Sequence, residues 1–373
     1  MSVMSEQSRR WASTMRGHLS GEEGLRTAHH PAVALGGAAG VLDREAREAE
    51  EEYFLAPGAS RSVGAGSRAI EEPADPWRTC FERDRDRILH SAAFRRLAGK
   101  TQVFIFPADH QRTRLTHALE VVQVANAISR ACRLNVSLTE AIALGHDCGH
   151  GPGGHASEEA LSPFLPEGFD HAVWGADVTA APLNLCAETL DGIRNHSWSR
   201  PSPGTPEGEV VALADRIAYC AHDLEDAVHA QIVTSDELPP IVAEHCGTTR
   251  GRQLDAFVTD AVTTTLSSGT VAISETMGEA LEALRRFNYE RIYLRQASVD
   301  QSAAVVALLR ALVDHYVTHP EALGQGAELV PGPDTLRAAV GYVSGMTDRF
   351  ACTKAVELFG DRAAALVNAM RPL

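Results

Sequence analysis

The sequence lacks any apolar run that approaches the roughly 20 residues a membrane-spanning helix needs, so we expect no membrane span. Cysteine is also sparse: the seven cysteines are scattered along the 373 residues and are never spaced as C-x-x-C. An odd, scattered set of this kind excludes a disulfide framework and a zinc ribbon. We therefore expect a reducing compartment and a cytoplasmic location.

Basic residues are fewer than acidic residues. Lysine and arginine number 34 against 49 aspartate and glutamate residues, which gives a formal net charge of -15 at pH 7. This surplus of negative charge argues against unselective binding to nucleic acid or to an anionic membrane. A locally basic site is still compatible with the balance.

Alternation of apolar and polar residues, the mark of a half-buried strand, is missing too, and helical spacing is present instead. Apolar residues recur at helical spacing over 113–135, and the capping-box sequence that starts at Ser137 predicts this residue as the N-cap of the next helix. That helix is expected to end where Gly149 and Gly151 interrupt it. Further helices are predicted at 207–233, 252–266, 275–290, 299–318 and 333–345.

These patterns predict a mostly α, all-α fold. Residues 1–75 differ from the rest, because they hold a charged run at 44–53, which could form a short helix, and a Gly- and Ser-rich stretch at 58–67. We predict a largely flexible extension over 1–75. Residues 76–373 are predicted to form one helical domain, with a metal-site core at about 113–233 and a C-terminal helical part at about 250–373.

A His-Asp dipeptide stands at the end of the helix that follows residue 137. It consists of His146 and Asp147, while an upstream helix carries His117 and a downstream helix carries Asp215. Imidazole nitrogens and carboxylate oxygens suit a first-row divalent cation, and two of each leave coordination positions open for water or substrate. Such a cation makes water more acidic and polarises an electrophile, which is the chemistry of hydrolysis.

The stretch ALGHDCGHGPGGH, residues 143–155, sets glycines between its histidines. Glycine weakens a helix and permits a tight turn. We expect the turn to direct His150 and His155 toward whatever the cation holds. A lone histidine is more often structural. The joint pattern of histidines and aspartates on separate helices instead favours a metal site.

Residues 83–117 form a basic block within an acidic protein. Arginine donates in a fork that suits phosphate oxygens, so the block predicts an anionic ligand. Arg114 stands three residues before His117, on nearly the same helical face, and we expect it and Arg112 to bind that ligand. The alternative, pairing with carboxylates, stays open above all for Arg83, Arg85 and Arg87.

The helix of Asp215 carries a stripe of polar residues. They follow Asp215 at i+4, i+7, i+8 and i+11 and are Tyr219, His222, Asp223 and Asp226. Such a stripe can line a pocket and offer donors and acceptors to a sugar hydroxyl. A solvated helix face is the alternative.

With these residues in view, the sequence resembles the HD-domain deoxynucleoside triphosphate triphosphohydrolases, the bacterial dGTPase-like proteins. The resemblance runs from about residue 75 to about residue 351. It rests on the blocks FERDRDRILHSAAFRRLAGKTQVF, RTRLTHALEV, LTEAIALGHDCGHGPGGHASEEAL, EGEVVALADRIAYCAHDLEDA, FNYERIY and GYVSGMTDRFA. It implies a helical HD-domain fold with extra C-terminal helices.

The resemblance also implies roles for individual residues. The family's metal ligands correspond to His117, His146, Asp147 and Asp215. His155 corresponds to the catalytic histidine and Glu158 to its acidic partner, and a histidine oriented by a carboxylate can protonate a leaving 5′-oxygen. His150 and His171 correspond to further active-site histidines. The expected substrate-binding residues are Arg114, Gln102, Tyr219, Asp223 and Lys100.

Members of this family hydrolyse dGTP or other deoxynucleoside triphosphates at the α-phosphorus, releasing a deoxynucleoside and inorganic triphosphate. The resemblance therefore implies a hydrolase with a divalent metal, Mn²⁺ or Mg²⁺ first and Fe, Co or Ni as alternatives. It also implies a homo-oligomer, often a hexamer, and leaves open a nucleotide or single-stranded DNA as effector.

Two departures from the family pattern fall beside the expected pocket. Gly153 and Gly154 stand in the loop where the family has a bulky Phe within GHPPFGH, and AVWGAD at 172–177 replaces a polar pattern. Two other functions stay open. One is an HD phosphohydrolase that acts on a nucleoside monophosphate or another phosphoester, and the other is a nucleotide-binding protein without catalysis.

Overall fold

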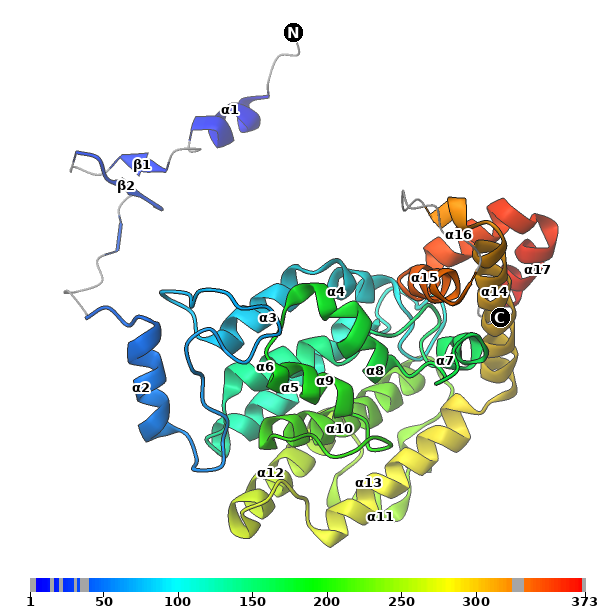
Figure 1. Cartoon of the computed structure of the whole chain (residues 1–373). Coiled ribbons are helices and arrows are strands. Elements are labelled where there is room, and N and C mark those ends of the chain that lie inside the picture. Colours follow the sequence, from blue (N-terminus) through cyan, green and yellow to red (C-terminus); the bar gives the residue numbers. More distant parts are fainter. Residues whose placement is uncertain are drawn as a thin grey trace. The chain divides into compact units, whose positions relative to one another are not determined.

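The computed structural model describes residues 5–13, 17–19, 23–29, 32–33, 40–323 and 332–370. The chain divides into two compact units, Met1–Leu42 and Asp43–Leu373. The described residues of the first unit form helix α1 (Glu6–Ser13) and a short antiparallel pair, β1 (His18–Leu19) and β2 (Arg26–Thr27), as Figure 1 shows.

The second unit consists of helices joined by turns (Figure 1). Its α-helices are α2 (Arg44–Phe54), α3 (Cys80–His90), α4 (Ala92–Arg96), α5 (Arg114–Ala131), α6 (Val136–Gly145), α7 (Ala156–Leu161), α8 (His171–Trp174), α9 (Ala187–Asn195), α10 (Pro206–His229), α11 (Pro240–His245), α12 (Arg250–Ser268), α13 (Glu275–Asn288), α14 (Gln296–Thr318), α15 (Pro333–Ser344), α16 (Asp348–Phe359) and α17 (Asp361–Ala369). Single π-helical turns stand at η3 (Gly175–Thr179) and η6 (Tyr289–Tyr293), and 3₁₀ turns at η1 (Leu97–Gly99), η2 (Ser162–Phe164), η4 (Ala181–Leu183), η5 (Ser235–Glu237) and η7 (Pro320–Leu323). The all-α prediction is confirmed.

Helices α5, α6 and α10 pack on one another at the centre of the second unit. This packing explains part of the helical apolar spacing in α5: Ile128 is fully buried in one cluster with Ile142 of α6 and Ile217 of α10, whereas Leu119 of the same spacing is exposed. A second cluster, which includes Leu309, joins α14 to α7, α15 and α16. The first cluster supports the helices that carry the predicted metal ligands, and the second supports the segment that follows His155.

Helix α6 begins and ends earlier than predicted. Its N-cap is Asn135, whose side chain accepts a hydrogen bond of 3.2 Å from the backbone N–H of Leu138, so the prediction of Ser137 as N-cap is wrong. The helix ends at Gly145, with His146 as its C-cap. The two residues of the His-Asp dipeptide therefore lie just past the helix, where the chain is free to turn.

The predicted boundary of the flexible extension, residue 75, is too late in the sequence. Residues from Asp43 onward belong to the second unit, and α2 confirms the short helix expected in the charged run. Arg68 lies 2.6 Å from Asp84, and both side chains are almost completely buried. This ion pair fixes the segment before residue 75 to α3. The rest of the predicted extension includes residues outside the described ranges.

In the described part of the chain, no helix has the length and apolar character that crossing a membrane requires. All seven cysteines lie in that part as well, and each is a buried free thiol.

Candidate active site

A cavity of about 820 Å³ lies among α5, α10, α13, α14 and the loop between α6 and α7. Eleven of the thirteen site residues predicted from the sequence line it: Gln102, Arg114, His117, Asp147, His150, His155, Glu158, His171, Asp215, Tyr219 and Asp223. The other two, His146 and Lys100, are buried. Segments far apart in the sequence are thus brought to one cavity.

The four predicted metal ligands converge at one end of this cavity. His117 on α5 places its Nε2 atom 3.0 Å from Oδ1 of Asp215 on α10. His146 Nε2 lies 3.7 Å from the same Asp215 oxygen and 3.5 Å from Oδ1 of Asp147. His117, His146 and Asp215 each offer a ligand atom within 4.8 Å of the others. The Nε2 atom of each of these two imidazoles therefore lies within 3.8 Å of an oxygen atom of both carboxylates.

His146 is oriented as a metal ligand would be. Its Nδ1 atom lies 2.7 Å from the carbonyl oxygen of Ala143 and donates to it, which leaves the lone pair on Nε2. That Nε2 atom is buried and has no hydrogen-bond partner among the described residues. A buried polar atom without a partner is costly. A divalent cation between His146 and the two carboxylates would satisfy it, so the residues fit a metal ion.

Arg114 balances the charge of the carboxylates. Its Nη1 atom donates a hydrogen bond of 2.7 Å to Oδ2 of Asp147. Burial would raise the pKa of Asp147, but the positive charge of Arg114 and the neighbouring imidazoles outweigh it and hold the pKa well below its usual value. Asp147 is therefore ionised at neutral pH and can act as a ligand.

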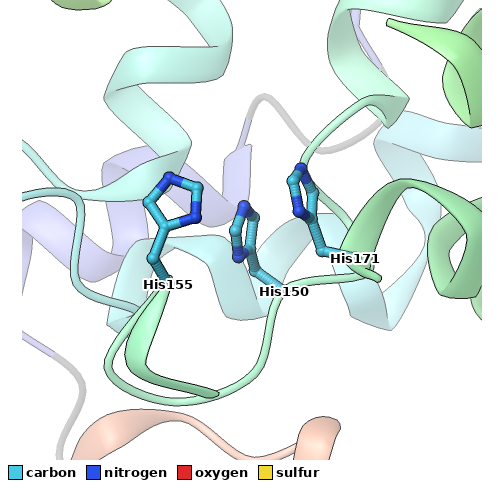
Figure 2. A group of neighbouring side chains, drawn as sticks. All are labelled: His150, His155 and His171. Carbon is cyan, nitrogen blue, oxygen red and sulfur yellow. The ribbon is translucent and has the colours of Figure 1, made fainter. Parts of the chain in front are cut away.

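Three further histidines lie beside the metal ligands, and Figure 2 shows the rings of His155, His150 and His171 next to one another. The rings of His150 and His171 are stacked, with centroids 3.7 Å apart, and the centroids of His150 and His155 are 5.0 Å apart. Glu158 joins two of these rings. Its Oε1 atom accepts a hydrogen bond of 2.7 Å from His171 Nδ1, and its Oε2 atom lies 3.2 Å from His155 Nδ1.

These histidines differ in solvent exposure and in the charges around them. Burial and the charge of Arg114 hold the pKa of His150 well below its usual value, so that ring is neutral. Burial would raise the pKa of Glu158, but the hydrogen bonds to His155 and His171 outweigh it and keep the carboxylate ionised. The side chain of His155 is 73 % exposed, whereas that of His150 is 1 % exposed. His155 is therefore the histidine that can exchange a proton with solvent and is oriented by a carboxylate.

The cavity also carries tyrosines and a protonatable carboxyl. Burial raises the pKa of Asp223 to about 7. Its Oδ2 atom accepts a hydrogen bond of 2.6 Å from the hydroxyl of Tyr293, while Oδ1 has no partner in the described part of the chain. The hydroxyl of Tyr219 accepts a hydrogen bond of 2.9 Å from Arg285. These groups can bind neutral hydroxyls, which suits a sugar.

The polar stripe predicted on α10 is divided between two environments. Tyr219 and Asp223 line the cavity. His222 and Asp226 are buried beside Arg112, which donates to the His222 carbonyl oxygen and to the Asp226 carboxylate. Only half of the stripe is therefore available to a ligand.

Several basic residues bind the protein's own acceptors instead of facing the cavity. Arg112 also pairs with Glu120 at 2.8 Å and Glu225 at 2.6 Å, so the expectation that it binds an anion is wrong. Arg83, Arg85 and Arg87 follow the alternative interpretation, with carboxylates of Glu72, Asp86 and Glu140 within 3.2 Å.

Lys100 has a structural position. Its amine donates to the carbonyl oxygens of His150 and, over 3.1 Å, of Ser344, and burial lowers its pKa to about 8. Both contacts hold the amine away from a ligand, in contrast to the substrate-binding role predicted for it.

Several residues that were not predicted from the sequence also line the cavity. Arg285, Tyr289 and Tyr293 are spaced four apart, which places them on one helical face, and that spacing was a signal available in the sequence. His196 also lines the cavity, with Nε2 3.3 Å from Nε2 of His171. A lone histidine before a Pro-rich loop carries no comparable signal.

The comparisons with known proteins agree with this geometry. Residues 114–220 match the HD domain, and residues 271–357 match the phosphohydrolase-associated domain. A crystal structure of a hypothetical protein from Aquifex aeolicus, 17 % identical, has a TM-score of 0.50 and covers 77 % of this chain and 70 % of its own, which shows a shared fold.

Two curated relatives cover most of the chain. A deoxyguanosinetriphosphate triphosphohydrolase-like protein from Caldanaerobacter subterraneus subsp. tengcongensis is 42 % identical over 327 residues, which are 85 % of this chain and 95 % of that protein. A protein of the same name from Clostridium perfringens is 41 % identical over 304 residues, which are 77 % of this chain and 88 % of that protein. The chain therefore belongs to the HD-domain family of deoxyguanosinetriphosphate triphosphohydrolase-like proteins.

Proposed function

We propose that the protein hydrolyses deoxynucleoside triphosphates at the α-phosphorus and releases a deoxynucleoside and inorganic triphosphate. The observation that carries the proposal is the convergence of two imidazoles and two carboxylates next to His155, which Glu158 orients. The names of the curated relatives support the same substrate class. dGTP is the first substrate to test, followed by the other three dNTPs.

The metal is proposed to be Mn²⁺ or Mg²⁺, held by His117, His146, Asp147 and Asp215. When bound, a divalent ion supplies a Lewis acid that polarises a phosphoryl group and makes water more acidic. The protein's part is to present two carboxylates that stay ionised: burial would raise the pKa of Asp215, but its hydrogen bond with His117 lowers it below the usual value.

The cationic and histidine side chains around this site act on the phosphates. Arg114 has Nε and Nη2 atoms that are buried without partners among the described residues, so they can donate to phosphate oxygens. His150 and His171 lie beside His155 and line the same part of the cavity. These donors stabilise the negative charge that spreads over the phosphoryl oxygens during displacement.

His155 donates the proton that the departing 5′-oxygen needs. Its ring is exposed to the cavity and to solvent, and Glu158 holds its Nδ1 side at 3.2 Å, which leaves Nε2 for the leaving group. Glu158 also binds His171 and is thereby fixed in place. The proton then returns from water after the nucleoside leaves.

The deoxyribose is proposed to lie against Tyr219 and Asp223. The Asp223 carboxyl can donate or accept a hydrogen bond at the 3′-hydroxyl because its pKa is raised by burial to about 7. The Tyr219 ring beside it would fill the space that a 2′-hydroxyl needs, which accounts for a preference for deoxyribose.

A product assay tests the proposed function. The protein is incubated with each dNTP and each dNMP in Mn²⁺ or Mg²⁺, and the products are separated by anion exchange. Inorganic triphosphate is the product that supports the proposal. Release of inorganic phosphate from dNMPs would instead favour a monophosphate hydrolase, and saturable dNTP binding without turnover in either metal would favour a nucleotide-binding protein.

We propose in addition a homo-oligomer in the cytoplasm, and activation of hydrolysis by a nucleotide or by single-stranded DNA. The buried free thiols support the compartment, and the family supports assembly. Light scattering gives the subunit number. Assays with dNTP mixtures, with and without single-stranded DNA, reveal activation as a rate that exceeds the sum of the separate rates.

A further inference from the structure

Asp348, at the start of α16, connects the C-terminal helices to the loop that carries the catalytic histidines. Its Oδ1 atom accepts a hydrogen bond of 2.8 Å from the backbone N–H of Gly153. Its Oδ2 atom accepts 2.9 Å and 2.6 Å bonds from the backbone N–H and the hydroxyl of Thr101. The side chain is buried, and one carboxylate thus satisfies three donors from two segments about 200 residues or more away in sequence.

The first of these segments is the loop between α6 and α7. Gly153 lies between His150 and His155, so a fixed Gly153 N–H restrains the backbone that carries both rings. Gly153 has a φ of +72°, and a Cβ atom there would lie 2.6 Å from the Val305 side chain on α14. The loop is therefore held against the C-terminal helices from two sides, by Asp348 and by close packing on Val305.

The second segment leads to Arg114. Thr101 forms an antiparallel bridge with Thr113, and the Arg114 N–H donates a hydrogen bond of 3.2 Å to the Lys100 carbonyl oxygen. A carboxylate that fixes Thr101 therefore also fixes the start of α5, from which Arg114 reaches Asp147. The Lys100 amine reinforces the arrangement by joining the carbonyl oxygens of His150 and Ser344.

We propose that Asp348 is a positioning residue for the reaction: it holds the loop of His150 and His155 and the segment before Arg114 in one arrangement. The expected effect of Asp348 on turnover rests on the proposed function. Asp348 does not line the cavity and is not one of the four proposed metal ligands, but Thr101 and Gly153, which it binds, both line the cavity. Its loss is therefore expected to change the placement of catalytic groups and to leave metal binding intact. Phosphohydrolase-associated residues 271–357 would thereby form part of the working site.

The test compares Asp348→Asn with Asp361→Asn, an exposed aspartate in the first turn of α17. Asn has one accepting oxygen, and its amide NH2 group can only donate, so one of the two backbone donors loses its partner. We expect kcat for dNTP hydrolysis to fall about 10- to 100-fold, as for other outer-shell partners, with KM changed less than about threefold and the metal content equal to wild type. Asp361→Asn should match wild type in every measurement.

Hydrogen–deuterium exchange provides a readout that does not need activity. In Asp348→Asn, peptides that cover residues 149–156, 99–103 and the start of α5 should exchange faster, while peptides from residues 118–131 of α5 and from α10 keep their wild-type rates. Thr101→Val removes a single hydroxyl bond and keeps the buried carboxylate, so it serves if Asp348→Asn fails to fold. Thr101→Val should change the exchange rates and kcat in the same direction as Asp348→Asn, but by less.

The outcomes separate the two proposals. Unchanged exchange at 149–156 overturns the inference, and so does faster exchange with kcat within about twofold of wild type. A loss of metal together with the loss of kcat would also contradict it. If the wild-type protein releases no triphosphate, the proposed function fails, and the exchange measurement still decides whether Asp348 holds the loop.

Discussion

The guanidinium of Arg114 donates a hydrogen bond of 2.7 Å to Asp147, and the side chains of the two residues are only 3 % and 4 % exposed. A carboxylate at that depth needs a positive partner, because an unpaired buried charge is strongly destabilising. Arg114 is such a partner, and a divalent cation is proposed to be a second one. The stability of variants at Arg114 should therefore depend on metal.

Replacement of Arg114 by Ala removes one of these partners. In metal-free buffer the free energy of unfolding should fall by about 3–5 kcal/mol, which is typical when one member of a buried pair is removed. With saturating Mn²⁺ the loss should be smaller, since the ion compensates the Asp147 charge. Denaturant unfolding with and without Mn²⁺ measures both values. An equal loss in the two buffers would show that no ion shares the Asp147 carboxylate.

Asp215→Ala should abolish metal retention. The Asp215 carboxylate lies within 3.7 Å of Nε2 of both His117 and His146, so its loss removes an anionic ligand from the centre of the cluster. Elemental analysis after dialysis should find at most a small fraction of the wild-type metal. Asp314→Ala, which removes an exposed aspartate on α14, is the matched control and should retain metal. Wild-type metal content in Asp215→Ala would contradict the proposed ligand set.

His155→Ala should separate catalysis from metal binding. Without the proton donor, kcat should fall by about 100-fold or more, while the metal content stays that of wild type. Glu158→Gln keeps the shape but not the charge that orients His155 and should lower kcat by about 10- to 100-fold. His319→Ala, at an exposed histidine after α14, should be unaffected. Triphosphate release at the wild-type rate by His155→Ala would refute its role.

Asp223→Asn should change the pH dependence of stability. Burial raises the pKa of Asp223 to about 7 in the folded protein, against about 3.9 when unfolded. Between these values the folded state binds more protons than the unfolded state, so this carboxyl makes the wild type less stable as pH rises from about 4 to about 7. The neutral Asn lacks this contribution, which amounts to roughly 4 kcal/mol at most.

The measurement is denaturant unfolding of both proteins from pH 5 to pH 7.5 in metal-free buffer. The stability of Asp223→Asn relative to wild type should increase toward pH 7. Parallel curves for the two proteins would mean that Asp223 is ionised in the folded state throughout, as a solvated aspartate would be.

The sequence allowed the helices to be predicted, and it allowed the meeting of His117, His146, Asp147 and Asp215 to be predicted, because both depend on residue type and spacing. The N-cap of α6 was not determined in the same way, since Asn135 and Ser137 are both good capping residues. Tertiary contacts decide between them. The side chain of Glu140, expected to complete the Ser137 capping box, instead accepts a hydrogen bond of 2.8 Å from Asn126 and pairs with Arg85.

Contacts between distant segments could not be predicted from local patterns. Lys100 and Ser344 meet although 244 residues separate them, and the pairing of Arg68 with Asp84 is decided by how α3 packs. A basic residue in a motif is equally compatible with a ligand and with the protein's own carbonyl oxygens. The same limit explains why Arg112 was assigned to an anion and proves to pair with carboxylates.

The cavity has walls from several stretches of the chain. All four proposed ligands fall within residues 114–220, whereas Arg285, Tyr289 and Tyr293 come from the segment that follows. Part of the wall that would face the nucleoside therefore lies apart in sequence from the proposed ligands and can change among relatives without the loss of a ligand, whereas Tyr219 and Asp223 share α10 with Asp215. A chimera that exchanges residues 271–357 for those of a relative would replace the walls formed by Arg285, Tyr289 and Tyr293 while keeping all four proposed ligands.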